Sequence, residues 1–347
     1  MKPSIINLIK QTTLYRLAGV LVIAGTVLIF SCNKSSGVNQ DTTGNSATDL
    51  QTQADDQAQV SNESDAIVDD ANTALNSQSS VSGSGSQVSS VISTMSTVSA
   101  NSTAGNDRIL STSLICDASV VWGDSAGLRT ITITYNGTNC WGNRTRTGVV
   151  VITIPDGVYW RNAGAAVTVN IENLTITRLR DNKTIVINGT KTITNTSGGL
   201  LVDLPTLDSI THTITGSLTI GFPNGTRRSW NVSKQRVFSY NDGVVITTTG
   251  THSDDNGNTD VAEWGTNRFG VSFESLITQP KVIAQSCDYR LVSGQNEVLR
   301  SDNITSTITY GLDSNGNPSS CPGTGTYYFK LVVTKPNGNT YTYILPY

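Results

Sequence analysis

Residues 129–135 read Arg-Thr-Ile-Thr-Ile-Thr-Tyr, a strict alternation of polar and apolar side chains. Successive side chains of a β-strand point to opposite faces of the sheet, so Ile131, Ile133 and Tyr135 share one face and the threonines share the other. The pattern predicts a strand with one buried face. Further strand patterns follow along the chain at Val149–Ile154, which is apolar on both faces, and at Val167–Ile171, Ile185–Ile187 and Ile304–Ile308.

Turn signals separate these strand patterns. Asn-Gly and Asp-Gly pairs tolerate the positive φ of two-residue hairpin turns. Such pairs begin at Asn136, Asp156, Asn188, Asn224, Asp242, Asn256, Asn315 and Asn337. No helical pattern interrupts them, so we expect an all-β domain over residues 106–347. The prediction is an antiparallel β-sandwich or an extended twisted meander of hairpins, built as one assembly or as two similar halves.

The charge pattern argues against a nucleic-acid partner. Charged residues make up 14% of the chain, and the formal net charge is −3. Residues 33–105 carry eight acidic side chains and one basic one, whereas residues 106–347 carry eighteen and nineteen. Neither part has the dense positive field that displaces counterions from phosphates.

The segment before the β domain differs in composition. Residues 33–105 contain no aromatic residue, proline or cysteine and are rich in Ser, Thr, Gln, Asn and Asp. Such a chain buries too little apolar area to offset its conformational entropy. We therefore expect residues 32–105 to form a lipidated N-terminus and a flexible linker, a largely disordered stalk that could hold a short helix. The helix candidate is Gln59–Leu75, because Val60, Ile67, Val68, Ala71 and Leu75 fall partly on one helical face.

The first residues have the pattern of an export signal. Basic side chains at Lys2, Lys10 and Arg16 precede an apolar run of fourteen residues, Leu17–Phe30. That run is shorter than the roughly 20 residues that a membrane-spanning helix needs, so a signal peptide over residues 1–31 is favoured over an uncleaved anchor.

The apolar run ends in Leu28-Ile-Phe-Ser-Cys32, which resembles a lipobox, in which a small residue precedes the cysteine that receives diacylglycerol. Acylation of Cys32 would hold the protein on a membrane through lipid. Asn33 is not the aspartate that retains lipoproteins at the inner membrane, so we expect an outer-membrane lipoprotein. Both a periplasmic and a surface-exposed orientation stay open.

Four further cysteines lie in the β domain: Cys116, Cys140, Cys287 and Cys321. In an oxidising compartment an even number indicates two disulfides, and four cysteines allow three connectivities. The local pairing, Cys116 with Cys140 and Cys287 with Cys321, would join neighbouring strands near each end of the domain. A zinc site requires close Cys or His pairs, which the sequence lacks.

Four segments share a further pattern: Cys116 to Cys140 with its 129–135 strand, Arg144–Ile154, Ile185–Thr194, and the closing Cys287 to Cys321 segment with Thr307–Gly311. Together they resemble an uncharacterised family of β-rich Bacteroidota lipoproteins. The resemblance covers most of residues 110–345. The family's Asp-Gly-x-Cys-Asp turn before the last cysteine is replaced here by a longer Asp313–Cys321 segment. The resemblance implies the fold and the export, and it implies no activity.

Two arrangements could support hydrolysis. Gly123-Asp-Ser-Ala-Gly127 fits the G-x-S-x-G pattern, in which Ser125 would need His212 or His252 and an acid such as Asp203. That motif works where a strand turns into a helix, whereas this one lies between two strand patterns, so a hairpin turn is favoured. Glu263 and Glu274 could form a carboxylate pair for glycoside hydrolysis. Isolated glutamates in an acid-poor domain are more often exposed strand residues, so that interpretation is favoured.

Oxygen-bearing side chains alternate at Asp254, Asn256, Asn258 and Asp260 around Gly257, which makes them calcium candidates. The glycine lies one place short of the EF-hand position and no bidentate Glu follows, so an Asx-rich turn is favoured and no cofactor is expected.

Five tryptophans could fill the core or stack on sugar faces, and the core is favoured: Trp122, Trp141, Trp160, Trp230 and Trp264.

The sequence predicts a membrane-anchored exported lipoprotein whose β domain is a non-catalytic binding or structural module. Its expected partners are membrane lipid through acylated Cys32 and a glycan or an envelope or host protein. The alternative is a cell-envelope hydrolase that acts on glycan or ester.

Overall fold

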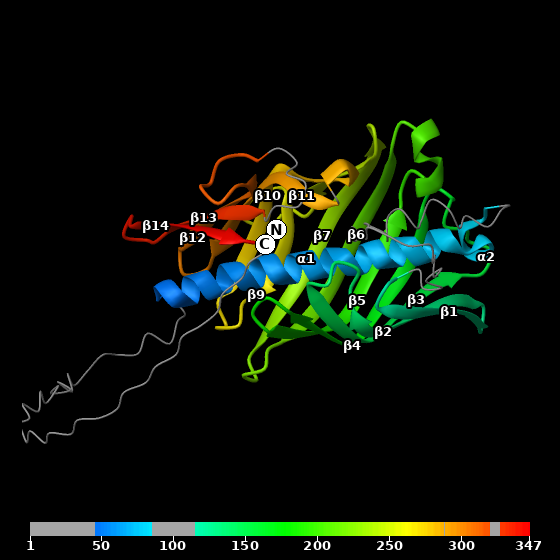
Figure 1. Ribbon diagram of the computed structural model, residues 1–347, viewed down its shortest axis with the longest axis horizontal. Helices are drawn as coiled ribbons and strands as arrows, with labels where there is room; N and C mark the ends of the chain where they lie inside the picture. Colours follow the sequence, from blue (N-terminus) through cyan, green and yellow to red (C-terminus); the bar gives the residue numbers. More distant parts are fainter. Residues whose placement is uncertain (1–45, 85–114, 288, 320–326) are drawn as a thin grey trace, which may run out of the picture. The chain divides into compact units, whose positions relative to one another are not determined.

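The computed structural model describes residues 46–84, 115–287, 289–319 and 327–347. These residues belong to one compact unit, Asp41–Tyr347. Its helical elements are α1 (Ala47–Ser77), α2 (Ser79–Ser82), η1 (Leu201–Thr206) and η2 (Gln285–Cys287) (Figure 1). Its strands are β1 (Ala118–Ser125), β2 (Leu128–Thr138), β3 (Arg144–Pro155), β4 (Ala165–Arg178), β5 (Lys183–Asn195), β6 (Ile210–Gly221), β7 (Arg227–Tyr240), β8 (Val244–Gly250), β9 (Val261–Thr266), β10 (Ser272–Ala284), β11 (Arg290–Arg300), β12 (Thr305–Leu312), β13 (Tyr328–Thr334) and β14 (Thr340–Pro346).

The fold is all-β and antiparallel, and it is the meander of hairpins rather than the sandwich. One 14-stranded sheet runs in chain order from β1 to β8 and then from β10 to β14. Strand β9 lies off this path, paired with β7 and β10. The predicted 129–135 strand lies in β2, where Ile131, Ile133 and Tyr135 are all at most 2% exposed.

Six of the eight Asn-Gly and Asp-Gly pairs lie between strands, as predicted, and two do not. Asn136-Gly137 lies within β2, and Asn188-Gly189 lies within β5. At Gly189 a Cβ atom would come within 2.3 Å of the Ser217 carbonyl oxygen on β6. Glycine is needed there because two backbones approach closely, not because the chain turns.

Helix α1 differs most from expectation. Residues 32–105 were predicted to be a flexible linker, but residues 47–77 form a 31-residue helix, continued by α2. The side chain of Ser46 caps the helix by accepting a hydrogen bond of 3.1 Å from the Asp49 amide. The five apolar positions of the Gln59–Leu75 pattern are at most 1% exposed, so the helix predicted there is confirmed and is longer than expected.

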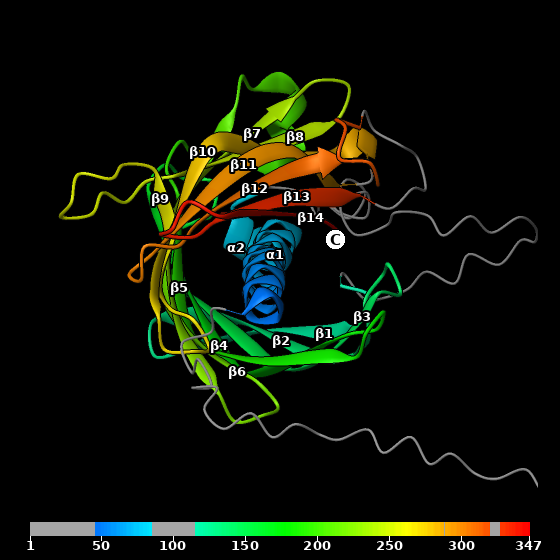
Figure 2. The same ribbon diagram turned by 90° about the vertical axis from the view of Figure 1, so that its left-hand side faces the viewer.

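The sheet curls around α1, which runs along its concave face (Figure 2). The inward side chains of most strands pack with α1 in one continuous core. At its far end α1 is held through α2, because the amides of Trp160 and Arg161 donate hydrogen bonds to the carbonyl oxygens of Val81 and Ser82. Strands β1 and β14 are the two edges of the sheet, and Figure 2 shows β1–β3 and β12–β14 on opposite sides of α1.

Within the described part of the chain, no helix combines the length and the apolar character needed to cross a bilayer. The apolar run Leu17–Phe30 and Cys32 lie outside the described residues.

Candidate functional site

Helix α1 carries seven acidic side chains and no basic one: Asp49, Asp55, Asp56, Glu63, Asp65, Asp69 and Asp70. Six of them form ion pairs with basic side chains of the strands and of the loops that connect them. The partners are Arg144, Arg146, Arg178, Arg180, Lys183, Lys234, Arg236 and Arg268. A polar helix can therefore be buried here because its charges meet opposite charges.

The middle of α1 lies over two basic side chains of β7. Lys234 and Arg236 have fully buried side chains, and each forms an ion pair with Asp65, at 3.1 and 3.3 Å. Arg236 also binds Asp69 at 2.6 Å. Burial alone would raise the pKa of Asp65, but Lys234 and Arg236 outweigh it and hold that pKa below its usual range.

Glu263 on β9 completes this buried cluster. Its carboxylate accepts hydrogen bonds from Gln57 at 2.8 Å and Ser61 at 2.6 Å, and it pairs with Lys234 at 2.5 Å. Both partners of the Lys234–Glu263 pair are fully buried. One carboxylate thus links α1 to two strands.

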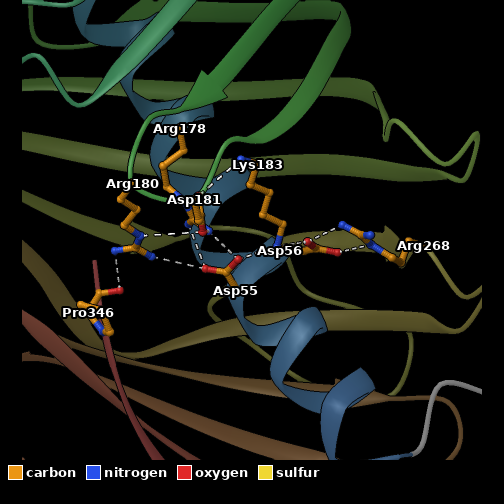
Figure 3. A network of polar contacts seen from close by, with 8 residues as sticks. All are labelled: Asp55, Asp56, Arg178, Arg180, Asp181, Lys183, Arg268 and Pro346. Carbon is orange, nitrogen blue, oxygen red and sulfur yellow. Dashed lines mark hydrogen bonds and ion pairs between the residues drawn. The ribbon is translucent and has the colours of Figure 1, made fainter. Parts of the chain in front are cut away.

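A second network surrounds the beginning of α1 (Figure 3). Asp55 accepts two hydrogen bonds from Arg178, at 2.9 and 2.8 Å, and pairs with Lys183, while Asp56 pairs with Arg268. Desolvation would raise the pKa of Asp55, but the hydrogen bonds from Arg178 and Lys183 outweigh it and lower the pKa to about 2. In the same network, Arg180 donates a hydrogen bond of 2.9 Å to the carbonyl oxygen of Pro346, which connects the β4–β5 hairpin to the last strand.

Beyond this network a cleft of about 540 Å³ opens over α1. Its floor is the helix face of Asn62, Asp65, Ala66, Asp69, Asp70 and Thr73. One wall is the β2–β3 turn with Arg144 and Arg146; the other comes from β8, β10, the start of β11 and the C-terminal residues Tyr327 and Tyr347. The volume lies within the roughly 300–1,000 Å³ of small-molecule sites.

The first rim of the cleft is a rigid turn that presents Trp141. Cys140 is joined to Cys116 by a disulfide with a Cα–Cα distance of 5.3 Å. The side-chain oxygen of Asn139 accepts hydrogen bonds from the amides of Asn143 and Arg144, at 3.1 and 3.2 Å. Trp141 lies on this fixed turn with 42% of its surface exposed.

The opposite rim carries Tyr289, next to η2. Its backbone has φ 54°, a left-handed conformation that non-glycine residues rarely adopt. Its buried hydroxyl has no hydrogen-bond partner among the described residues, and neither does Nε of Arg144 across the cleft. Desolvation, followed by the nearby Asp69 carboxylate, raises the pKa of Tyr289 to about 12, so the hydroxyl keeps its proton. Buried polar atoms without a partner are uncommon in folded proteins, and an ordered water or ion is one explanation for them.

The structure confirms one of the predicted disulfides. Cys116 and Cys140 form it, and it joins the start of β1 to the end of β2. Cys287 is disulfide-bonded as well. Cys321 lies outside the described residues.

The calcium candidates lie in the loop between β8 and β9. The Asp254 carboxylate accepts hydrogen bonds from the amides of Asn256 and Asn258 and from both of their side chains, which is the geometry of an Asx turn. Against desolvation, these hydrogen bonds lower the pKa of Asp254 to about 2. Asp260 lies in the same loop at φ 61°. Within residues 46–84 and the described parts of 115–347, no three His, Cys, Asp or Glu side chains are arranged to hold a metal ion.

Neither hydrolytic arrangement is assembled. Ser125 ends β1, whereas His212 lies on β6, buried between Trp160 and Phe238 with no hydrogen-bond partner for either ring nitrogen among the described residues. His252 stacks on Trp264 with the ring centroids 4.1 Å apart. Asp203 lies in η1.

Glu263 and Glu274 point to opposite faces of the sheet. Glu263 is fully buried against α1. Glu274 is partly exposed, and it accepts a hydrogen bond of 3.3 Å from Asn258 in the outer loop. The sheet therefore separates the two carboxylates.

The tryptophans divide between core and surface. Trp160 and Trp230 are at most 1% exposed and belong to the core, Trp122 and Trp264 are half-buried, and Trp141 is exposed at the cleft. The favoured core interpretation therefore holds for two of the five.

Sequence reasoning missed the acidic face of α1 and its basic partners. A signal was present in β7, where Trp230, Val232, Lys234, Arg236 and Phe238 follow one alternation. Basic residues in phase with apolar ones point inward, and a buried cation requires an anion opposite it. The acid-rich segment 49–70 was the source of that anion.

Comparisons with protein-family models, curated proteins and solved structures found no match to this chain.

Proposed function

We propose that this protein is an exported lipoprotein, anchored to a membrane through acylated Cys32, whose β domain binds a ligand in the cleft over α1. The observation that carries the binding role is the cleft itself, with a polar floor and an exposed tryptophan on its rim. Pre-organised sites bind more tightly because less conformational entropy is lost on binding. The turn with Trp141 meets that condition, since a disulfide and the Asn139 hydrogen bonds fix it.

Export and anchoring are supported by the N-terminal sequence. The basic residues, the fourteen-residue apolar run and the Ser31-Cys32 junction together fit a lipoprotein signal. The Cys116–Cys140 disulfide agrees with an oxidising compartment outside the cytoplasm.

Metabolic labelling tests the anchor. The wild-type chain is expected to incorporate labelled fatty acid in a bacterial host, and Cys32→Ser is expected to lose the label. The double variant Cys116→Ser/Cys140→Ser serves as the control and should keep it. Label retained by Cys32→Ser contradicts the proposed anchor.

A binding experiment tests the cleft independently of the anchor. The full-length protein and its Trp141→Ala variant are applied to arrays of purified glycans and of purified envelope and host proteins. A ligand that binds the wild type and binds Trp141→Ala at least about tenfold more weakly supports the cleft as the site. Ligands that bind both proteins equally place recognition elsewhere and contradict the proposal.

A further inference from the structure

We infer that the cleft is a site for a neutral saccharide, which stacks on Trp141 and forms hydrogen bonds with Tyr289 and Arg144. The inference rests on the proposed binding function and adds the class of ligand and the residues that contact it.

The charges of the cleft floor argue for a neutral ligand. Asp65 and Asp69 bind Arg236, and Asp70 binds Arg146 at 2.6 Å. These carboxylates are compensated within the protein, so a cationic ligand finds no free counter-ion there. The walls of the cleft also carry Arg144, Arg146, Lys281 and Arg290. Acidic and basic side chains thus line the cleft together, so a net charge of either sign on the ligand would meet like charges as well as opposite ones.

The unpartnered polar atoms argue for hydroxyl groups. Nε of Arg144 can only donate a hydrogen bond, and the phenol of Tyr289 can donate or accept. The carboxylate of Asp69, which is paired with Arg236, can only accept further hydrogen bonds. A hydroxyl group does both, so neighbouring hydroxyls on one ring can satisfy all three kinds of partner. The side chain of Asp69 is 38% exposed and is therefore accessible from the cleft.

The aromatic rim argues for a saccharide among the hydroxyl-bearing ligands. An exposed indole offers a flat apolar face that matches the C–H face of a sugar ring, while its edges stay polar. Trp141 is held on its turn by the Cys116–Cys140 disulfide, and Tyr289 is held at a positive φ next to the disulfide-bonded Cys287. Strained backbone of this kind persists where the surrounding structure over-determines it, and it is concentrated at ligand sites. Both contact residues are thus fixed before the ligand arrives.

The test is a titration of the full-length protein in a detergent without a sugar headgroup. Three sets of probes are compared: neutral tetrasaccharides (cellotetraose, maltotetraose, chitotetraose, mannotetraose and xylotetraose), sulfated tetrasaccharides, and tetrapeptides. Calorimetry measures the dissociation constants, and the melting temperature of each variant shows that it is folded.

We expect at least one neutral tetrasaccharide to bind. Trp141→Ala should weaken that binding about tenfold or more through loss of stacking. Tyr289→Phe removes one hydroxyl and should weaken the binding of the tetrasaccharide about threefold to tenfold.

The matched controls are Trp264→Ala, which removes a tryptophan stacked on His252, and Tyr240→Phe at a tyrosine that is 51% exposed. Neither residue lines the cleft, so both variants should bind like the wild type.

Three results would overturn the inference. If no neutral tetrasaccharide binds, the ligand class is wrong. If only sulfated sugars or peptides bind, and Trp141→Ala weakens that binding, the cleft remains a binding site and only the saccharide assignment fails. If a neutral tetrasaccharide binds all four variants like the wild type, the site is wrong.

Discussion

Lys191 on β5 is 1% exposed, and its ammonium group donates hydrogen bonds of 2.5 Å to the carbonyl oxygen and the hydroxyl of Ser64. Desolvation is the main reason that its pKa falls from 10.5 to about 7, with Lys234 and Arg236 adding to the effect and Asp65 opposing it. The folded state therefore binds this proton less tightly than the unfolded state. Stability is lost as the pH falls from about 10.5 to 7, and the loss is nearly complete at pH 7.

Replacing Lys191 with methionine should stabilise the protein. We expect the free energy of unfolding at pH 7 to rise by about 1–3 kcal/mol, since a buried charge is replaced by an apolar chain of similar length. The gain should shrink as the pH approaches 10, because the folded state holds Lys191 uncharged and removing its proton costs less as the pH nears the unfolded pKa of 10.5. Denaturant titrations at pH 7 and 9.5 measure both effects, with Lys330→Met, a partly exposed residue of β13, as the control. A less stable Lys191→Met protein at pH 7 would contradict this account.

His212 gives the fold a sensitivity to acid. Burial, and then the charge of Arg236, lower the pKa of His212 from 6.5 to about 3. Between these two pH values the unfolded chain binds a proton that the folded chain does not, so stability falls as the pH falls through this window. The cost at pH 4.5 relative to pH 7 is about 2–3 kcal/mol.

His212→Phe should remove that component of the acid sensitivity, because phenylalanine fills the space between Trp160 and Phe238 without titrating. Unfolding free energies at pH 7 and 4.5 measure the difference, and His252→Phe at the chain's other histidine is the control. An unchanged loss of stability in His212→Phe between the two pH values is the result that this explanation does not allow.

At the scale of elements, α1 depends on charge pairing as well as on apolar burial. Val60, Val68 and Leu75 are fully buried, but so are Ser64 and Glu263, which lie between the helix and the sheet. A helix of this composition is marginal in isolation, and it owes its stability to tertiary contacts. The strands can be predicted from the local sequence alone, because alternation specifies both the element and its buried face.

Glu263→Ala tests this dependence. Removing the carboxylate leaves Lys234 with Asp65 as its anion, and it takes away the acceptor of the hydrogen bonds that Gln57 and Ser61 donate. We expect a loss of about 3–5 kcal/mol in unfolding free energy, the usual cost of breaking a buried pair, and faster hydrogen exchange along α1. Adding Lys234→Met to Glu263→Ala should restore part of the lost stability.

The control is Glu172→Ala, at an exposed position of β4, with an expected change within about 0.5 kcal/mol. A Glu263→Ala protein as stable as this control would show that α1 does not need the pair.

At the scale of the whole molecule, β1 is an edge strand, held by its pairing with β2 and by a disulfide at the open end of that hairpin. Cys116 and Cys140 are 24 residues apart. A crosslink closing a loop of that length stabilises by about 3–4 kcal/mol in the chain-entropy model.

The double variant Cys116→Ser/Cys140→Ser should therefore unfold about 3 kcal/mol more easily than the wild type. It should also bind any cleft ligand more weakly, because the turn that carries Trp141 loses its anchor. Denaturant titration and calorimetry measure the two quantities, and addition of reductant to the wild type should reproduce both losses. Equal stability of the double variant and the wild type would show that the disulfide does not stabilise the fold at this edge strand.

The sequence by itself determined the strands, the antiparallel class and most of the turns, because alternation and turn residues act over a few neighbours. It also indicated the Cys116–Cys140 pairing as one option and the helical face around Val60 and Leu75. Only the tertiary structure decided that a polar segment is buried inside the sheet, that Gly189 serves a close approach, and that Trp141 and Tyr289 lie at one cleft. These features depend on contacts between residues far apart in the chain, such as Ser61 with Glu263, which are 202 positions apart. Local patterns carry no information on which distant charges will meet, since burial of a charge becomes favourable only when its partner is in place.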